Sequence, residues 1–144
     1  MFKTVLVAAD SSETAARAVS TAAELVKVMG GTLHVVNAYK PEPVRADQLP
    51  GEFSNTQSEP ADLLLSDLRL AIESAGVKAE YHAAKGDPAE AIVRVADRIE
   101  ADLIVMGNKG MKGVRRVLGS VPNSVAHQAN CSVLIVDTVP KGED

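Results

Sequence analysis

The chain has 144 residues and a net charge of −4 at pH 7, with 46% apolar and 24% charged residues. This length suits one domain with a sizeable core, so we expect a single domain over residues 1–144. The acidic balance argues against non-specific nucleic-acid binding, and the few aromatic residues offer no stacking platform for single strands. No apolar run approaches the roughly 20 residues of a membrane span. Neither nucleic acid nor a membrane is therefore an expected partner.

Short apolar runs alternate with segments of helical periodicity from one end of the chain to the other. We expect strands at 4–9, 32–38, 77–84, 103–106 and 132–137, and helices at 12–29, 61–75, 86–96 and 123–129. Residues 39–60 hold four prolines and are expected to form a flexible lid or loop, and 139–144 a frayed tail. The alternation predicts an α/β fold: a five-stranded parallel sheet, Rossmann-like, in a three-layer α/β/α arrangement.

One cysteine, Cys131, cannot form an internal disulfide, which fits a reducing compartment. It is expected to be a small buried apolar residue. The first four residues lead directly into a strand and lack the pattern of a signal peptide. We therefore expect a cytoplasmic protein.

Parallel sheets bind ligands beyond the carboxyl ends of their strands, where the strand order reverses. Two segments fit that position: Ala8-Ala9-Asp10-Ser11 after the first strand, and a glycine-containing loop after the fourth. Asp10 has two interpretations, a cap for the following helix or a ligand contact that completes a magnesium site with phosphate oxygens. Nothing else in the sequence predicts a metal site.

The glycine-containing loop runs from Gly107-Asn108-Lys109-Gly110 through Gly113 to Gly119-Ser120-Val121-Pro122, and a helix follows. Glycines let backbone N–H groups approach a ligand closely, and a helix N-terminus carries partial positive charge. The order strand, glycine loop, helix therefore predicts a phosphate site, with Ser120 at or near the helix N-cap. The loop also holds four basic residues, which either complement a phosphate or form a solvated face: Lys109, Lys112, Arg115 and Arg116.

Other candidate groups favour structural roles. The three histidines, His34, His82 and His127, are scattered along the chain, and His34 is expected to be a core residue with its hydrogen bonds satisfied. Asp87 is expected to cap a helix, with Glu90 reaching back to support it. No P-loop pattern and no paired nucleophile and base are present, so no catalytic residue is predicted.

Four segments together resemble the universal stress protein family over nearly the whole chain. They are Val5-Leu6-Val7-Ala8-Ala9-Asp10 with the residues that follow, Leu33-His34-Val35-Val36, the run from Ala101 to Gly107, and Leu118-Gly119-Ser120-Val121-Pro122 leading to the last strand. The ATP-binding branch of that family has the pattern G-x2-G-x9-G-[ST]. This sequence has G-x2-G-x8-G-S, which is one residue shorter.

The resemblance implies the family's nucleotide-binding fold and a role for each matching position. Ala8 would lie against the adenine, and Val35 would contact the adenine edge through its backbone. Asp10 would lie near the ribose or a phosphate-bound magnesium ion. The remaining positions would line the ribose and phosphates: Gly107, Asn108, Lys109, Gly110, Gly113, Gly119, Ser120, Val121 and Pro122.

The leading hypothesis is a stress-response signalling module that binds ATP with magnesium and has little or no catalytic activity. The alternatives are a cyclic AMP-binding second-messenger buffer and a slow ATPase or adenylyl-transferring enzyme. A family member that binds no nucleotide is a further alternative, against which the glycine loop argues. The apolar last strand would be an exposed sheet edge, and the resemblance implies a homodimer through residues 132–137.

Overall fold

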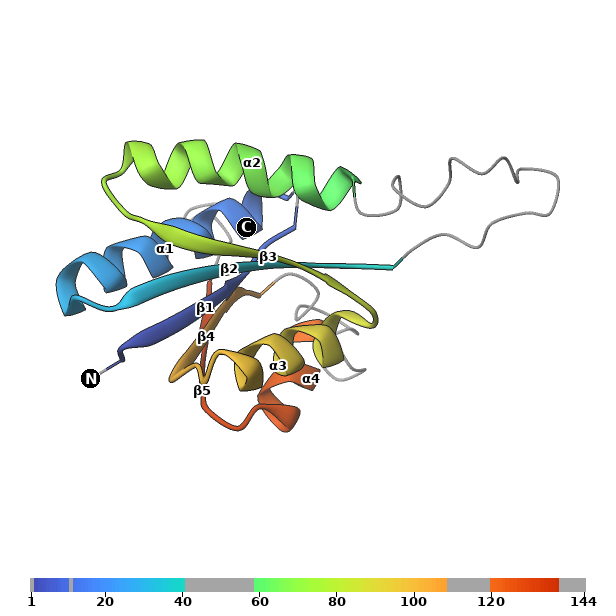
Figure 1. Ribbon diagram of the computed structural model, residues 1–144. Coiled ribbons are helices and arrows are strands. Elements are labelled where there is room, and N and C mark those ends of the chain that lie inside the picture. The colour runs from blue at the N-terminus through green and yellow to red at the C-terminus, as the bar shows by residue number, and fades with distance from the viewer. Residues whose placement is uncertain (1, 11, 41–58, 109–119, 138–144) are drawn as a thin grey trace, which may run out of the picture.

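The computed structural model describes residues 2–10, 12–40, 59–108 and 120–137. Five parallel strands form one sheet in the order β3-β2-β1-β4-β5, and helices cover both of its faces (Figure 1). The strands are β1 Thr4–Ala8, β2 Thr32–Tyr39, β3 Ala79–Lys85, β4 Leu103–Gly107 and β5 Ser132–Val136. The helices are α1 Glu13–Met29, α2 Glu59–Ser74, α3 Pro88–Arg98 and α4 Val121–Gln128. The predicted three-layer α/β/α fold is confirmed.

Each central strand contributes side chains to two separate cores. In β1, Val5 and Val7 pack with α1 and α2, whereas Leu6 packs with α3 and α4. All three are completely buried. This double burial explains why the strand is a continuous apolar run, because both of its faces are covered by helices.

The helix ends use the local signals that the sequence contains. Ser12 caps α1, its hydroxyl accepting a hydrogen bond of 3.2 Å from the Ala15 N–H. Gly30 ends α1 in the left-handed region, with φ +76°, which a glycine adopts without strain. Asp87 and Ser120 cap α3 and α4. Of these caps, Ser12 and Ser120 fix the starts of the two helices next to the candidate site, α1 after β1 and α4 after β4.

Most expected element boundaries agree with the structure to within two residues. The expected loop at 39–60 is too long at both ends, because Tyr39 belongs to β2 and Pro60 to α2. β3 starts at Ala79 and not at 77, because the N–H of Val77 bonds to the Ile72 carbonyl and completes the turn that ends α2. The expectations for 41–58 and for the tail at 139–144 lie outside the described residues.

The strand order reverses between β1 and β4. From β1 the chain proceeds to β2 and β3 on one side, and from β4 to β5 on the other. Ligands bind at such a point, outside the carboxyl ends of the strands. The fold therefore places the candidate site between the ends of β1 and β4.

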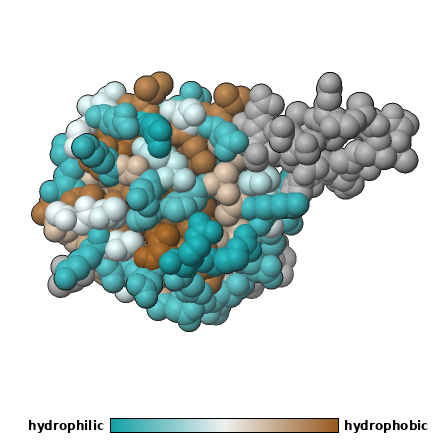
Figure 2. Space-filling model, viewed as in Figure 1, coloured by the Kyte–Doolittle hydropathy of each residue, from teal (hydrophilic) through white to brown (hydrophobic). Residues whose placement is uncertain are grey.

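The surface is mixed in character. The face shown in Figure 2 is mostly hydrophilic, with separate hydrophobic patches, some of them over α2, where Leu63 and Leu70 are exposed. Single exposed apolar residues are ordinary on folded domains. In the part of the chain that the structure describes, no helix combines the length and apolarity that a membrane crossing requires.

Candidate nucleotide site

The ends of β1 and β4 lie side by side. The parallel register pairs Val5 with Leu103 and Val7 with Val105. The carboxyl ends of β1 and β4 therefore lie at the same edge of the sheet, where the segment containing Asp10 follows β1 and Asn108 follows Gly107, the last residue of β4. The structure thus brings together two of the segments that the sequence analysis selected separately.

A buried side chain from β2 holds the turn after β1. The amide of Asn37 donates a hydrogen bond of 2.7 Å to the carbonyl oxygen of Ala9, and the Ala9 N–H donates to the carbonyl of Val36 at 2.9 Å. Asn37 is buried. Both polar groups of the Ala9 backbone are therefore fixed, which sets the position of the next residue, Asp10.

Asp10 is exposed at the start of this turn. Its Oδ1 accepts hydrogen bonds from the Ser12 N–H, at 2.8 Å, and from the Ser12 hydroxyl. Asp10 is therefore not the cap of α1, which is Ser12, but it holds that cap residue through these two hydrogen bonds. The same carboxylate lies at the edge where the strand order reverses, and carboxylate and phosphate oxygens are the ligands that magnesium prefers.

Ser120 begins α4, as expected. Its Oγ accepts a hydrogen bond of 3.3 Å from the Asn123 N–H, and its carbonyl accepts from the Ser124 N–H at 3.0 Å. Pro122 is buried in the first turn, and Val125 is completely buried against the sheet core. The first turn is thus anchored, while Val121 remains exposed.

Asn108 has a partner that the sequence analysis did not select. Its side-chain amide donates a hydrogen bond of 3.0 Å to Oδ1 of Asp137, the residue that follows β5. This bond joins the carboxyl ends of two neighbouring strands. The signal was available in the sequence, because an amide and a carboxylate directly follow two strands that the fold places next to each other.

Val35 does not lie at this edge. It is in the interior of β2, paired with Val7 on one side and Tyr81 on the other, and it has no exposed surface. The residues at the carboxyl end of β2 are Asn37 to Tyr39. The sheet and its covering helices thus enclose the Val35 side chain. The expected adenine contact is through the Val35 backbone, and it stays a prediction.

Several predicted positions lie outside the described residues. They are Lys109, Gly110, Gly113 and Gly119, together with the basic residues Lys112, Arg115 and Arg116. Their contact with a nucleotide stays a prediction.

Comparison with known proteins identifies the family. The model of the universal stress protein family matches residues 1–137. The chain belongs to the universal stress protein family. A universal stress protein of Mycobacterium tuberculosis is 38% identical over 143 residues, covering 95% of this chain and 97% of the relative. One from Thermus aquaticus is 37% identical over 139 residues, covering 94% of this chain and 99% of the relative.

Solved structures of universal stress proteins share the fold. One described as a universal stress protein in complex with cAMP is 31% identical, with a TM-score of 0.80, covering 96% of this chain and 99% of that one. A universal stress protein from Archaeoglobus fulgidus in complex with dAMP is 27% identical, with a TM-score of 0.71, covering 94% and 98%. The sequence-based recognition of the family is therefore confirmed.

In this universal stress protein, two of the three scattered histidines lie in contact. His34 Nδ1 is 3.0 Å from His82 Nε2, and their rings stack with centroids 5.2 Å apart. Burial lowers the pKa of both imidazoles. The nearby His34 and Arg98 lower that of His82 further, while Glu80 opposes both shifts. His34 is a buried residue with its hydrogen bond satisfied, as expected, but the sequence analysis missed its partner because the two residues are 48 positions apart.

The other residues considered in the sequence analysis, Cys131, Asp87 and Glu90, have surroundings typical of structural residues. Cys131 is half-buried, and burial with the nearby Asp97 and Asp102 raises the pKa of its thiol. Asp87 caps α3 by accepting a hydrogen bond of 3.5 Å from the Glu90 N–H. The contact at Glu90 thus comes from its backbone and not, as expected, from its side chain.

Proposed function

We propose that this universal stress protein binds an adenine nucleotide at the carboxyl ends of β1 and β4, and that the nucleotide is ATP with magnesium. The observation that carries this proposal is that β1, which the Asp10 turn follows, and β4, which ends at Gly107, are neighbouring parallel strands where the strand order reverses. This is the position at which open parallel sheets bind ligands.

Each described residue has a role that its surroundings favour. Ala8 packs against the core on the α3–α4 side of the sheet, so its small side chain leaves room for a flat base above the strand end. Asp10 supplies a carboxylate for a phosphate-bound magnesium ion. The backbone N–H groups at the start of α4, where Ser120 is the cap, are donors for phosphate oxygens.

The ligand would act as a signal. A bound nucleotide shifts a protein between states only through different affinities for them, and a binding module needs no catalytic group for this. We therefore propose a regulatory role in a stress response, with little or no intrinsic hydrolysis. Specific ATP turnover well above background would favour the alternative of a slow ATPase or adenylyl-transferring enzyme.

Cyclic AMP is the second candidate ligand. Two solved relatives carry a single phosphate on the bound nucleoside, one as cAMP and one as dAMP. In addition, the glycine loop is one residue shorter than the ATP-binding pattern. The cyclic nucleotide would make this protein a second-messenger buffer.

Calorimetric titration with ATP, ADP, AMP and cyclic AMP, each with and without magnesium, distinguishes these ligands. We expect ATP to bind most tightly and to need magnesium. Asp10→Asn should reduce the magnesium dependence, and the double variant Gly119→Glu/Ser120→Ala should abolish binding by placing a carboxylate at the phosphate position. Preference for cyclic AMP would replace ATP in the proposal, and no binding to any of the four would overturn it.

The Ser120 substitution needs a matched control, because loss of an N-cap itself costs about 1 kcal/mol. Asp87→Ala removes the equivalent cap of α3, which follows β3, two strands from β1. That separation is about 10 Å. Asp87→Ala should lower stability by a similar amount and leave nucleotide affinity unchanged. The single variant Ser120→Ala is measured beside it. If Asp87→Ala lowered nucleotide affinity as much as Ser120→Ala, the loss of affinity in Ser120→Ala would come from lost stability and not from the site.

We also propose a homodimer through β5. This strand is the edge of the sheet, and Leu134 on it is 38% exposed. An exposed apolar edge strand usually pairs or is covered. Pairing with a second copy would satisfy both its backbone and its apolar side chains.

A further inference from the structure

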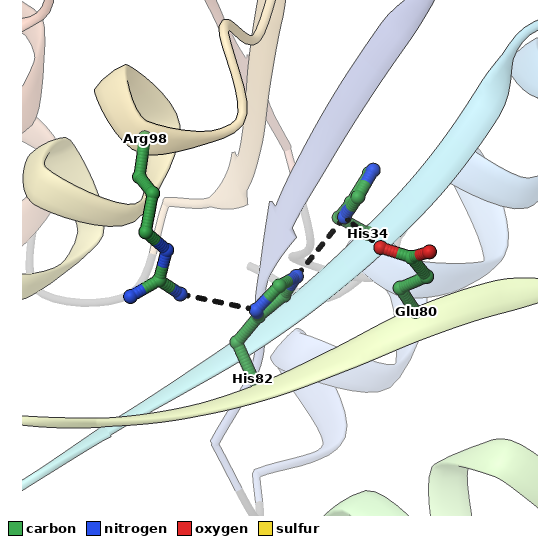
Figure 3. A network of polar contacts seen from close by, with 4 residues as sticks. All are labelled: His34, Glu80, His82 and Arg98. Carbon is green, nitrogen blue, oxygen red and sulfur yellow. Dashed lines mark hydrogen bonds and ion pairs between the residues drawn. The ribbon is translucent and has the colours of Figure 1, made fainter.

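Three groups that can bind a metal ion converge on one face of the sheet, away from the nucleotide edge. His34 is on β2, and Glu80 and His82 are on the neighbouring edge strand β3. The register pairs His34 with Glu80 and Val36 with His82. Val36 and Ala84 pack in the core beneath α3, so the alternation of side chains places His34, Glu80 and His82 on that same face. Figure 3 shows the three side chains meeting between the two strands, with Arg98 of α3 on the far side of His82.

Two of the three separations are close to those of a tetrahedral metal centre. His34 Nδ1 lies 3.0 Å from His82 Nε2 and 3.4 Å from Glu80 Oε2. At zinc–ligand distances of 2.0–2.2 Å, two ligand atoms of a tetrahedral site are about 3.4 Å apart. One ligand atom from each of the three residues lies within 4.8 Å of the others. The Glu80 side chain is 70% exposed, so it can turn to close the longest separation without disturbing the core.

Hydrogen bonding alone does not account for the approach of the Glu80 carboxylate to His34 Nδ1. Arg98 Nη2 lies 3.2 Å from His82 Nδ1. Because a guanidinium only donates, this ring nitrogen accepts. The proton of neutral His82 is then on Nε2, where it is donated to His34 Nδ1. His34 Nδ1 therefore has no hydrogen to share with the Glu80 carboxylate, although the two atoms are 3.4 Å apart.

We propose that His34, Glu80 and His82 form a binding site for a zinc ion, with a water molecule as the fourth ligand. Two imidazole nitrogens and one carboxylate are a ligand set that zinc accepts, and three protein ligands leave one coordination position open. A divalent cation among the three atoms replaces the single shared proton and attracts the Glu80 carboxylate as well as both ring nitrogens. The set contains two nitrogens, so it does not suit magnesium or calcium, which take oxygen ligands.

Arg98 competes with the metal ion. When His82 binds zinc through Nε2, its proton moves to Nδ1, which then no longer accepts a hydrogen bond from Arg98. The guanidinium must turn away, and its positive charge opposes a cation at this distance. Arg98 thus opposes metal binding, because it stabilises the metal-free histidine pair.

The test is titration of the purified full-length protein with zinc chloride, in competition with a chromophoric chelator. We expect one zinc ion per chain. His82→Gln and Glu80→Gln should each weaken binding by at least about 10-fold, and Arg98→Gln should strengthen it by about 10-fold. His127→Gln, which removes an exposed histidine of α4, should have no effect. Equal zinc affinity in the wild type, His82→Gln and Glu80→Gln would overturn the proposal, as would the absence of zinc binding.

A second measurement uses the unaltered chain, so it does not depend on whether the variants fold. Imidazole ¹⁵N spectra should show His34 Nδ1 and His82 Nε2 shifting on zinc addition while both nitrogens of His127 remain unchanged. Shifts confined to His127 would place the metal elsewhere and overturn the site. The nucleotide proposal uses none of the three metal-binding side chains, and His82 is on β3, two strands from β1. That is about 10 Å at the spacing of neighbouring strands. His82→Gln should therefore leave nucleotide affinity unchanged.

Discussion

The side-chain amide of Asn37 donates a 2.7 Å hydrogen bond to the carbonyl oxygen of Ala9 and so ties the end of β2 to the turn that presents Asp10. Asn37 is one of two buried polar residues among those that the structure describes, and the other is His34. Buried polar groups in proteins are nearly always hydrogen-bonded. The Asn37 amide meets this requirement by donating to a backbone carbonyl of the candidate site. The same hydrogen bond therefore stabilises the sheet and holds the turn before Asp10 at the candidate site in place.

Replacing Asn37 with alanine should therefore affect both properties. The Ala9 carbonyl loses its donor, and an unsatisfied buried acceptor costs about 1–3 kcal/mol in the free energy of unfolding. Nucleotide affinity should fall as well, because the turn before Asp10 is no longer fixed. Urea denaturation and calorimetric titration measure the two effects. The control is Asn130→Ala, which removes an exposed amide bonded to Asp97 and should change stability by less than about 0.5 kcal/mol. Equal stability of the two variants would contradict the role given to Asn37.

Asp102 should make stability depend on pH in the acid range. Its Oδ2 accepts hydrogen bonds from the N–H groups of Thr4, at 2.9 Å, and Lys3, at 2.8 Å, and these hold its pKa below the ordinary value of 3.8. Because the folded-state pKa is lowered, the stabilisation is complete above the unfolded-state pKa and is lost as the pH falls through the folded-state value. The loss of the stability that Asp102 contributes is thus confined to the region below about pH 4.

Denaturation curves for the wild type and Asp102→Asn from about pH 6 down to about pH 3 test this expectation. The wild type should be the more stable protein at the upper end, and the difference should shrink as Asp102 becomes protonated. Other carboxyl groups titrate in both proteins, so only the difference between the two curves is informative. A difference that stays constant over the whole range would show that the Asp102 charge does not contribute.

Gly31 should not tolerate a side chain. A Cβ at this position would lie 2.8 Å from the carbonyl oxygen of Lys3 and 2.9 Å from that of Phe2, which are backbone atoms at the start of β1. Gly31→Ala must displace one of the two segments, and overpacking of this kind costs about 1–3 kcal/mol. Gly76→Asn is the matched control: Gly76 has φ +83° and open space around it, and asparagine tolerates that conformation. Thermal denaturation should show the larger loss for Gly31→Ala, and the reverse order would contradict the packing at this turn.

The proposed dimer gives a further prediction. Leu134→Glu would place an uncompensated charge in the β5 interface, which should weaken association by more than about 3 kcal/mol, or over 100-fold in the dissociation constant. Sedimentation equilibrium measures this change. Val28→Glu, at a residue of α1 that is 86% exposed, should leave the oligomeric state unaltered. A dimer that persists in Leu134→Glu would exclude this interface.

The sequence by itself determined the order and type of the elements and the segments that follow β1 and β4 at the candidate site. These features depend on local signals. Apolar runs such as the one from Thr4 to Ala8 predict buried strands, and cap residues such as Ser12, Asp87 and Ser120 mark where helices begin. The parallel connection rule then places every strand's carboxyl end on one edge, so the sequence alone predicts that Asp10 and Asn108 follow strands at the same edge.

Only the tertiary structure decided which side chains meet across the strands. Asn37 contacts Ala9 over 28 residues, and His34 contacts His82 over 48. No periodicity in the chain encodes such separations, because they follow from strand order and register. The same cause explains the burial of the Val35 side chain: the sequence showed its strand, but not that pairing on both sides would enclose it. The histidine pair and the turn-holding amide therefore became visible only once β2 was placed between β1 and β3, since packing of the whole sheet fixes which residues are neighbours.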